Sequence, residues 1–139
     1  MTTDSPVLNG SAASAKIVVG VDDAPENLKM LEAAVLAGGY TFVGAASGIK
    51  CVSMLTRMVP RLILLDIEMP DIDGFETCRR IRLSPELRHV PVAFLTARRA
   101  TEDVKQGLAV GGNDFIIKPF DIVKLLERIK YWTARTIHA

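Results

Sequence analysis

The sequence predicts an α/β fold in which helices cover both faces of a parallel β-sheet. Two observations lead to this prediction. Short apolar, β-branched runs alternate with helix-like runs, and the loops between them are short. The strand-like runs are also apolar at consecutive positions, which is typical of strands buried on both faces. The chain has 139 residues and 49% hydrophobic composition, so it suits one domain with a single core.

Each element has a local signal. Strands are expected over 16–21, 40–45, 61–66, 91–96 and 114–118. The first helix is expected over 25–37, because Pro25 suits a first turn and Gly38-Gly39 stops the helix. The other helices follow from candidate N-caps: Ser47 for 48–58, Asp73 for a helix from Gly74 with Glu76 in its first turn, Thr101 for the fourth helix, and Asp121 for 122–134.

The rest of the composition excludes several classes of protein. The net charge of +1 gives no bulk reason to expect nucleic acid or an anionic membrane as a partner. Residues 1–15 lack the basic and apolar regions of a signal peptide and are expected to form a flexible tail, followed by a domain over 16–133 and a short tail over 134–139. Cys51 and Cys78 have no metal-ligand spacing, which indicates reduced, packed thiols and a cytoplasmic protein.

Polar residues end four of the predicted strands: Asp22-Asp23, Asp66, Thr96 and Lys118. The carboxyl ends of parallel strands meet at one edge of the sheet, where ligands bind. One such carboxylate is usually a solvated cap, but residues from four strand ends are unlikely to converge by accident. Clustered carboxylate oxygens suit Mg²⁺, an aspartate can be a nucleophile toward phosphorus, and an ammonium and a hydroxyl suit phosphoryl oxygens.

Four motifs in this order resemble the receiver domains of two-component signalling, of the chemotaxis-regulator type. They are the acidic pair, "LILLDIEMPDIDGFE" around Asp66, "FLTA" with Thr96, and "GGNDFIIKPF" with Lys118. The resemblance covers about residues 16–133, with thirty residues from Asp66 to Thr96 and twenty-two more to Lys118. It implies a doubly wound, flavodoxin-like sheet of five strands and five helices, with strand order 2-1-3-4-5.

The resemblance also implies roles at the matching positions. Asp66 is expected to accept a phosphoryl group, and Lys118 to pair with that group. Asp22, Asp23, Asp66 and the backbone carbonyl of Glu68 are expected to hold Mg²⁺. The domain would catalyse its own phosphorylation and dephosphorylation, without being a multi-turnover enzyme.

The expected switch involves two more residues. Thr96 would bond the phosphoryl group and shift toward it, and Phe115 would turn into the space that Thr96 leaves, so that phosphorylation biases a packed two-state element. The Lys118–Pro119 bond is expected to be cis, again on the resemblance.

Some positions depart from the family pattern, and two others are candidates for tuning the lifetime of the phosphoryl group. Gly20 stands where a branched aliphatic residue is common, and Gly112-Asn113 replaces an Ala-Asp pair. Glu68 and Arg98 lie two residues beyond Asp66 and Thr96, where the family tunes the lifetime of the phosphoryl group. We hypothesise that they pair and gate the hydrolytic water; the alternative is two solvated side chains.

The resemblance implies a histidine kinase or a histidine phosphotransfer protein as phosphodonor. Asn27, Met30, Pro119 and Phe120 are candidate docking residues, although core packing is the alternative for Met30. The face of the fourth helix, fifth strand and fifth helix is expected to carry a downstream target, an output domain or a homodimer contact, in a stand-alone receiver or one excised from a longer protein. No nucleic acid or membrane is expected to be contacted directly.

Three other functions are less consistent with the sequence. A phosphatase of the haloacid-dehalogenase type needs a second aspartate two residues after the nucleophile, where this chain has Glu68. A pseudo-receiver that only binds proteins would not need the full set of acids, threonine and lysine. A flavodoxin-like cofactor binder would need a glycine-rich phosphate loop after the first strand, which the sequence lacks.

Overall fold

A computed structural model describes residues 16–97 and 101–135. Its five parallel strands form one sheet in the order β2-β1-β3-β4-β5, which confirms the predicted fold and strand order. The strands are β1 (Ile17–Val21), β2 (Thr41–Ala45), β3 (Leu62–Asp66), β4 (Val92–Thr96) and β5 (Asp114–Ile117). The helices are α2 (Pro25–Ala37), α3 (Gly48–Met54), α4 (Gly74–Ile81), α5 (Thr101–Ala109) and α6 (Ile122–Thr133), with a 3₁₀ turn η2 (Pro85–Leu87).

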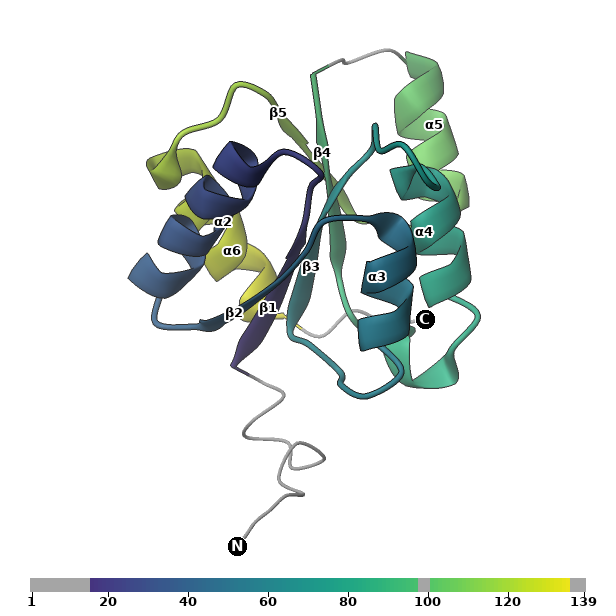
Figure 1. The fold of residues 1–139 in the computed structure, drawn as a ribbon, viewed down its shortest axis with the longest axis horizontal. Coiled ribbons are helices and arrows are strands. Elements are labelled where there is room, and N and C mark those ends of the chain that lie inside the picture. Colours follow the sequence, from purple (N-terminus) through teal and green to yellow (C-terminus); the bar gives the residue numbers. More distant parts are fainter. Residues whose placement is uncertain (1–15, 98–100, 136–139) are drawn as a thin grey trace, which may run out of the picture.

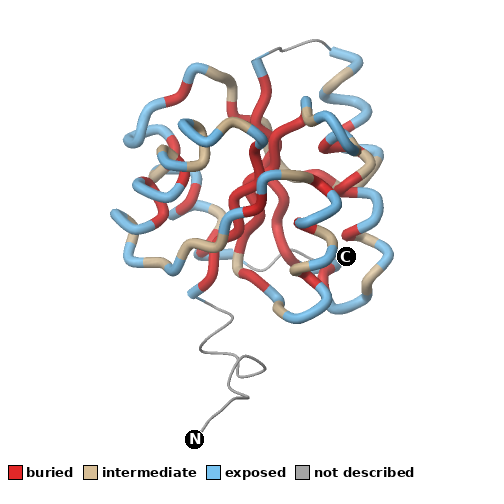
Figure 2. Tube along the Cα trace, in the orientation of Figure 1, coloured by how far each residue is buried: buried red, intermediate tan, exposed pale blue. Residues whose placement is uncertain are grey.

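The sheet is the middle of three layers. Helices α2 and α6 cover one face, and α3, α4 and α5 cover the other (Figure 1). Alternate residues of each inner strand therefore enter different cores: Val19 and Val21 pack with α3 and α4, whereas Val18 packs with α2 and α6. The buried centre and exposed helix surfaces in Figure 2 explain why the strands are apolar throughout.

Three of the predicted N-caps are confirmed. The side chains of Ser47, Asp73 and Asp121 each accept a hydrogen bond from the backbone N–H three residues later, at 2.8–3.1 Å. Thr101 is instead the first residue of α5, and the residue before it lies outside the described ranges. Most helix starts were therefore readable from local polar side chains, because capping is a local interaction.

Helix α3 is shorter than predicted. It ends at Met54, four residues before the predicted end at 58. In the next turn, backbone hydrogen bonds span three residues rather than four: the Thr56 N–H donates to the Ser53 carbonyl and the Arg57 N–H donates to the Met54 carbonyl. The Thr56 hydroxyl also donates to the Ser53 carbonyl. These tighter bonds end the helix before the chain turns into β3.

The structure explains the departures at Gly20 and Asn113, the first by packing and the second by hydrogen bonds. Gly20 pairs with Gly44 across β1 and β2, and a Cβ at Gly20 would lie 2.6 Å from the Phe42 ring. The Asn113 side chain accepts hydrogen bonds from the Val92 N–H at 2.8 Å and from Arg82 at 3.1 Å. Arg82 also donates to the carbonyls of Gly111 and Leu87, so it joins the end of α4 to the loop before β5.

The predicted tails at 1–15 and 134–139 lie wholly or mostly outside the described residues. Helix α6 ends at Thr133, with Ala134 as its C-cap. Within the described ranges, none of the helices has the length and apolarity needed to cross a membrane.

Candidate functional site

The carboxyl ends of β1, β3 and β5 bring four charged side chains together. The Lys118 ammonium lies 2.9 Å from Asp66 Oδ1 and 3.3 Å from Asp22 Oδ2. Asp22, Asp23 and Asp66 each offer a carboxylate oxygen, and these oxygens all lie within 4.8 Å of one another. Asp22 and Asp66 are buried and Asp23 is exposed, so the cluster opens to solvent on one side.

Asp22 is held by the start of α2. Its Oδ1 accepts a hydrogen bond from the Ala24 N–H at 3.0 Å, and its Oδ2 accepts one from the Asn27 amide at 3.2 Å. Asn27, a docking candidate in the sequence, therefore also orients an acid of the site. Docking at Asn27 stays a prediction.

Burial and charge act differently on the two members of the central ion pair. The pKa of the Asp66 carboxyl is raised from 3.8 to about 6, mainly by burial and in addition by the charges of Asp22 and Asp23, while Lys118 opposes the rise. Burial lowers the pKa of Lys118, but the hydrogen bond and charge of Asp66 together with Asp22 outweigh it, so this pKa is raised overall. Desolvation therefore dominates at the carboxyl and ion pairing at the lysine. Near neutral pH the site holds a charged lysine beside a mostly ionised, poorly solvated carboxylate.

Gly74 lets the chain pass directly over the end of β3. A Cβ at this position would lie 2.4 Å from the Asp66 carbonyl oxygen, and the Gly74 N–H donates to the Ile67 carbonyl at 2.7 Å. Glycine is thus needed here because the backbone segments approach closely, leaving no room for a side chain.

Thr96 and Phe115 lie on neighbouring strands. Thr96 ends β4 and is buried, and its carbonyl accepts a hydrogen bond from the Lys118 N–H at 2.7 Å. The Phe115 ring lies 5.3 Å from that of Phe94, which lies 5.3 Å from that of Phe75. A Cβ at Gly107 of α5 would lie 2.3 Å from the Phe115 ring, so this glycine provides the room for the ring.

The remaining candidate residues differ in how far they are exposed. Glu68 is exposed beyond β3, and its proposed partner Arg98 lies outside the described residues. The Lys118–Pro119 bond is cis, as the resemblance implied. Pro119 is exposed, but Phe120 is buried in the core with α2 and α6, so its side chain offers little docking surface.

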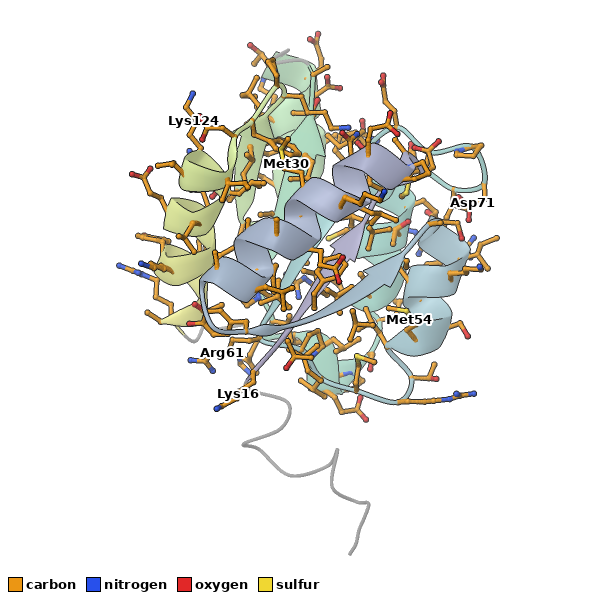
Figure 3. The ribbon with its side chains drawn as sticks, turned by 60° about the vertical axis from the view of Figure 1, so that its left-hand side comes forward. Lys16, Met30, Met54, Arg61, Asp71 and Lys124 are labelled. Carbon is orange, nitrogen blue, oxygen red and sulfur yellow. The ribbon has the colours of Figure 1, made fainter. Side chains whose placement is uncertain are left out.

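Met30 is partly buried against the same core (Figure 3). Its placement agrees with the packing alternative while leaving part of the side chain accessible. Docking at Met30 and Pro119 stays a prediction.

Sequence reasoning missed the role of Asp71. Its carboxylate accepts hydrogen bonds from the Ile49 N–H at 2.8 Å and the Gly48 N–H at 3.4 Å, at the start of α3. Figure 3 shows Asp71 beside that helix. Partial desolvation raises the pKa of Asp71, but the backbone N–H groups lower it more. No local pattern signals a cap that lies 22 residues away in sequence.

Comparison with known families decides the identity. Residues 18–130 match the response regulator receiver domain. The chain belongs to this family. The receiver domain is 42% identical over 120 residues to the response regulator PleD of Caulobacter vibrioides, an alignment that covers 86% of this chain and 26% of PleD. This receiver domain thus spans about a quarter of that relative's length.

Solved structures agree with the family. The chemotaxis protein CheY4 of Vibrio cholerae matches with a TM-score of 0.81 at 27% identity, over 84% of this receiver domain and 97% of that chain. The receiver domain of the sensor histidine kinase PA1611 from Pseudomonas aeruginosa matches with a TM-score of 0.79 at 32% identity, over 86% of this chain and 98% of that one. That structure holds a magnesium ion in its active-site cleft.

The residues of this receiver domain fit the same ion. Three carboxylates offer hard oxygen ligands within a small space, and the exposed side at Asp23 leaves room for water in the coordination shell. Asp66 and Asp22 also contact Lys118, so a divalent cation would share these acids with the lysine.

Proposed function

We propose that this receiver domain is a phosphorylation-dependent switch that accepts a phosphoryl group on Asp66. The observation that carries the proposal is the ion-pair cluster, in which residues from three strand ends place Lys118 against Asp66 and Asp22. A merely solvated cap would not need a buried carboxylate with a raised pKa.

The chemistry assigned to the residues is as follows. An Asp66 carboxylate oxygen attacks the phosphorus of a phosphohistidine, the new O–P bond forms as the P–N bond breaks, and the imidazole leaves with the bonding pair. Lys118 stabilises the negative charge of the phosphoryl oxygens. Asp22, Asp23, Asp66 and the carbonyl of Glu68 would hold Mg²⁺, which supplies further neutralisation of those oxygens.

Release of the phosphoryl group is proposed to use water. Water attacks the phosphorus, the bond to Asp66 breaks, and inorganic phosphate leaves while the carboxylate is restored. The domain thus promotes its own phosphorylation and dephosphorylation rather than acting as a multi-turnover enzyme. The proposed Glu68–Arg98 gate would slow this step, and Ala at both positions would shorten the phosphoryl lifetime.

The response is proposed to pass through Thr96 and Phe115. Thr96 moves toward the phosphoryl group, and the Phe115 ring changes its packing against Phe94 and Gly107. This proposal is supported by the placement of the two residues on the neighbouring strands β4 and β5 and by the space that Gly107 provides.

Partners follow from the family. A histidine kinase or phosphotransfer protein is the proposed phosphodonor, and the face of α5, β5 and α6 is the proposed contact for an output domain, a target or a second copy. A cytoplasmic location remains a prediction.

The test is phosphoryl incorporation from a small phosphodonor such as acetyl phosphate, with and without Mg²⁺. We expect labelling of the wild type that depends on Mg²⁺ and is absent from Asp66→Asn. Asp73→Asn is the matched control, because it removes a carboxylate from the same loop and keeps an N-capping side chain; it should label like the wild type. A folded wild type that takes up no label would overturn the proposal and favour the pseudo-receiver, which only binds proteins.

A further inference from the structure

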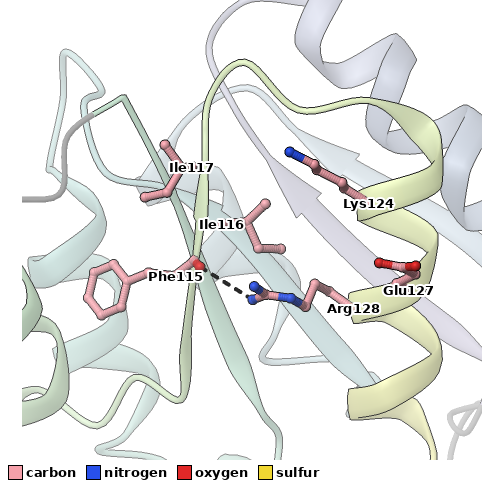
Figure 4. A pocket seen from close by; sticks show the side chains of 6 residues that line it. All are labelled: Phe115, Ile116, Ile117, Lys124, Glu127 and Arg128. Atoms are coloured by element: carbon pink, nitrogen blue, oxygen red, sulfur yellow. Dashed lines mark hydrogen bonds between the residues drawn. The ribbon is translucent and has the colours of Figure 1, made fainter.

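Both backbone polar groups of Phe115 are bound on the side of α6. Its N–H donates to Asp114 Oδ1 at 2.8 Å, and its carbonyl accepts a hydrogen bond from Arg128 Nη1 at 3.3 Å. Figure 4 shows the second bond, with Arg128 reaching from α6 toward β5. The backbone of the proposed switch residue is therefore tied to a helix beyond the edge of the sheet.

The two side chains that hold Phe115 also hold each other. Arg128 Nη1 lies 2.6 Å from both carboxylate oxygens of Asp114. The Trp132 indole, one turn further along α6, donates to Asp114 Oδ2 at 2.8 Å. We call Asp114, Arg128 and Trp132 the α6 clamp.

The Phe115 side chain points the other way. Figure 4 shows the ring on the side of β5 away from α6. There it packs against Phe94 and fills the room left by Gly107 of α5. One residue thus has its ring between α5 and the sheet and its backbone in the α6 clamp.

The α6 clamp is poorly suited to stabilising the fold. The Arg128 side chain is 45% exposed and that of Asp114 is 20% exposed, and surface ion pairs contribute about 0–1 kcal/mol. Its geometry, in contrast, is specific. Asp114 and Arg128 both bind the backbone of Phe115, and the Trp132 indole fixes the Asp114 carboxylate.

We infer that Asp114, Arg128 and Trp132 are positioning residues that transmit the packing state of Phe115 to helix α6. When the ring changes its packing against Gly107 and Phe94, the attached backbone shifts, and the Arg128 bond to its carbonyl and the Asp114–Trp132 bond shift with it. The inference rests on the proposed Thr96–Phe115 switch and names the route by which that switch reaches α6.

Trp132 provides a direct readout, because it is the single tryptophan of the chain. The experiment measures Trp132 emission and phosphoryl incorporation on the same sample, with acetyl phosphate and Mg²⁺. In the wild type we expect a change of emission that follows incorporation. In Arg128→Gln we expect wild-type incorporation with an emission change less than half as large, and in Arg128→Lys an intermediate change.

Two further variants separate the α6 clamp from a general effect. Glu127→Gln alters the neighbouring exposed residue of α6, which lines a pocket together with Phe115 and Arg128, and should behave like the wild type. Phe115→Leu removes the ring and should take up label with little change of emission.

The outcomes distinguish the inference from the proposed function. No incorporation in the wild type would overturn both. Incorporation without a change of Trp132 emission, or a full change in Arg128→Gln, would overturn the α6 clamp alone and leave Asp66 as the phosphoacceptor.

Discussion

The two ends of strand β5 carry two ion-pair clusters with opposite properties. At the carboxyl end, Lys118 pairs with the buried carboxylates of Asp66 and Asp22. At the amino end, Asp114 pairs with Arg128, whose side chain is 45% exposed. The buried cluster has shifted pKa values and suits chemistry, whereas the exposed one has short, specific contacts and suits positioning. A salt bridge on one strand can thus serve two purposes, and burial decides which.

Loss of the cation at the buried end should have the largest effect on stability. Lys118→Met leaves Asp66 and Asp22 buried without their counter-ion, and removing one partner of a buried pair costs about 3–5 kcal/mol. We expect a loss near the lower limit, about 3 kcal/mol at pH 7.5, because Lys118 is 24% exposed. Urea unfolding in metal-free buffer measures it.

This loss should shrink at acidic pH, where Asp66 is protonated and needs no counter-ion. An equal loss at pH 5 and pH 7.5 would mean that Lys118 stabilises the fold by packing rather than by charge.

A side chain at Gly74, where the backbone passes closely over the end of β3, should have the next largest effect on stability. Gly74→Ala places a Cβ against the Asp66 carbonyl, and such overpacking costs about 1–3 kcal/mol. It should also slow phosphoryl incorporation, because Asp66 must move. Gly39→Ala is the control: its φ of 85° also disfavours alanine, but nothing lies within 4 Å of the new Cβ. It should cost about 1 kcal/mol and leave incorporation unchanged.

Removal of the Asp66 charge should stabilise the protein while abolishing phosphorylation. The native protein holds the Asp66 proton up to about pH 6, whereas the usual pKa is 3.8. The native state therefore binds more protons than the unfolded state between these values, and its stability falls as pH rises through that window. Asp66→Asn should remove this fall and be about 1–2 kcal/mol more stable at pH 7.5.

The measurement is urea unfolding of both proteins from pH 4 to pH 8, with chelator present. If Asp66→Asn were less stable than the wild type at pH 7.5, the bond to Lys118 would outweigh the burial of the carboxylate.

Changes at the exposed end should have the smallest effect on stability. Arg128→Gln removes a partly exposed ion pair, so we expect a loss below about 1 kcal/mol. Thermal unfolding of this variant beside Lys118→Met tests the contrast directly. A loss as large as that of Lys118→Met would show that the two clusters are equivalent and that the α6 clamp is part of the core.

The sequence predicted the features that depend on local signals. The order of strands and helices follows from apolar runs and N-caps, and Asp22, Asp66 and Lys118 meet because each directly follows or ends a parallel strand. Their proximity required only the rule that the carboxyl ends of parallel strands meet at one edge.

The features that sequence reasoning missed are long-range contacts of polar side chains. Asp71 caps a helix 22 residues upstream, Arg82 binds a carbonyl 29 residues downstream, and Arg128 binds an acid 14 residues upstream. None of these contacts was predicted, because neither the periodicity nor the spacing of one chain shows which side chains meet after folding.

Because of the Asp71 cap, the loop after β3 contributes to the start of two helices, α3 and α4. Residues 67–73 lead from β3 into α4, yet this loop also supplies the carboxylate that accepts hydrogen bonds from the first N–H groups of α3. A graft of this loop from a relative would therefore exchange the start of two helices at once. A loop of a different length would leave α3 with Ser47 as its remaining side-chain cap, so the lengths of the loops before α3 and before α4 are not independent.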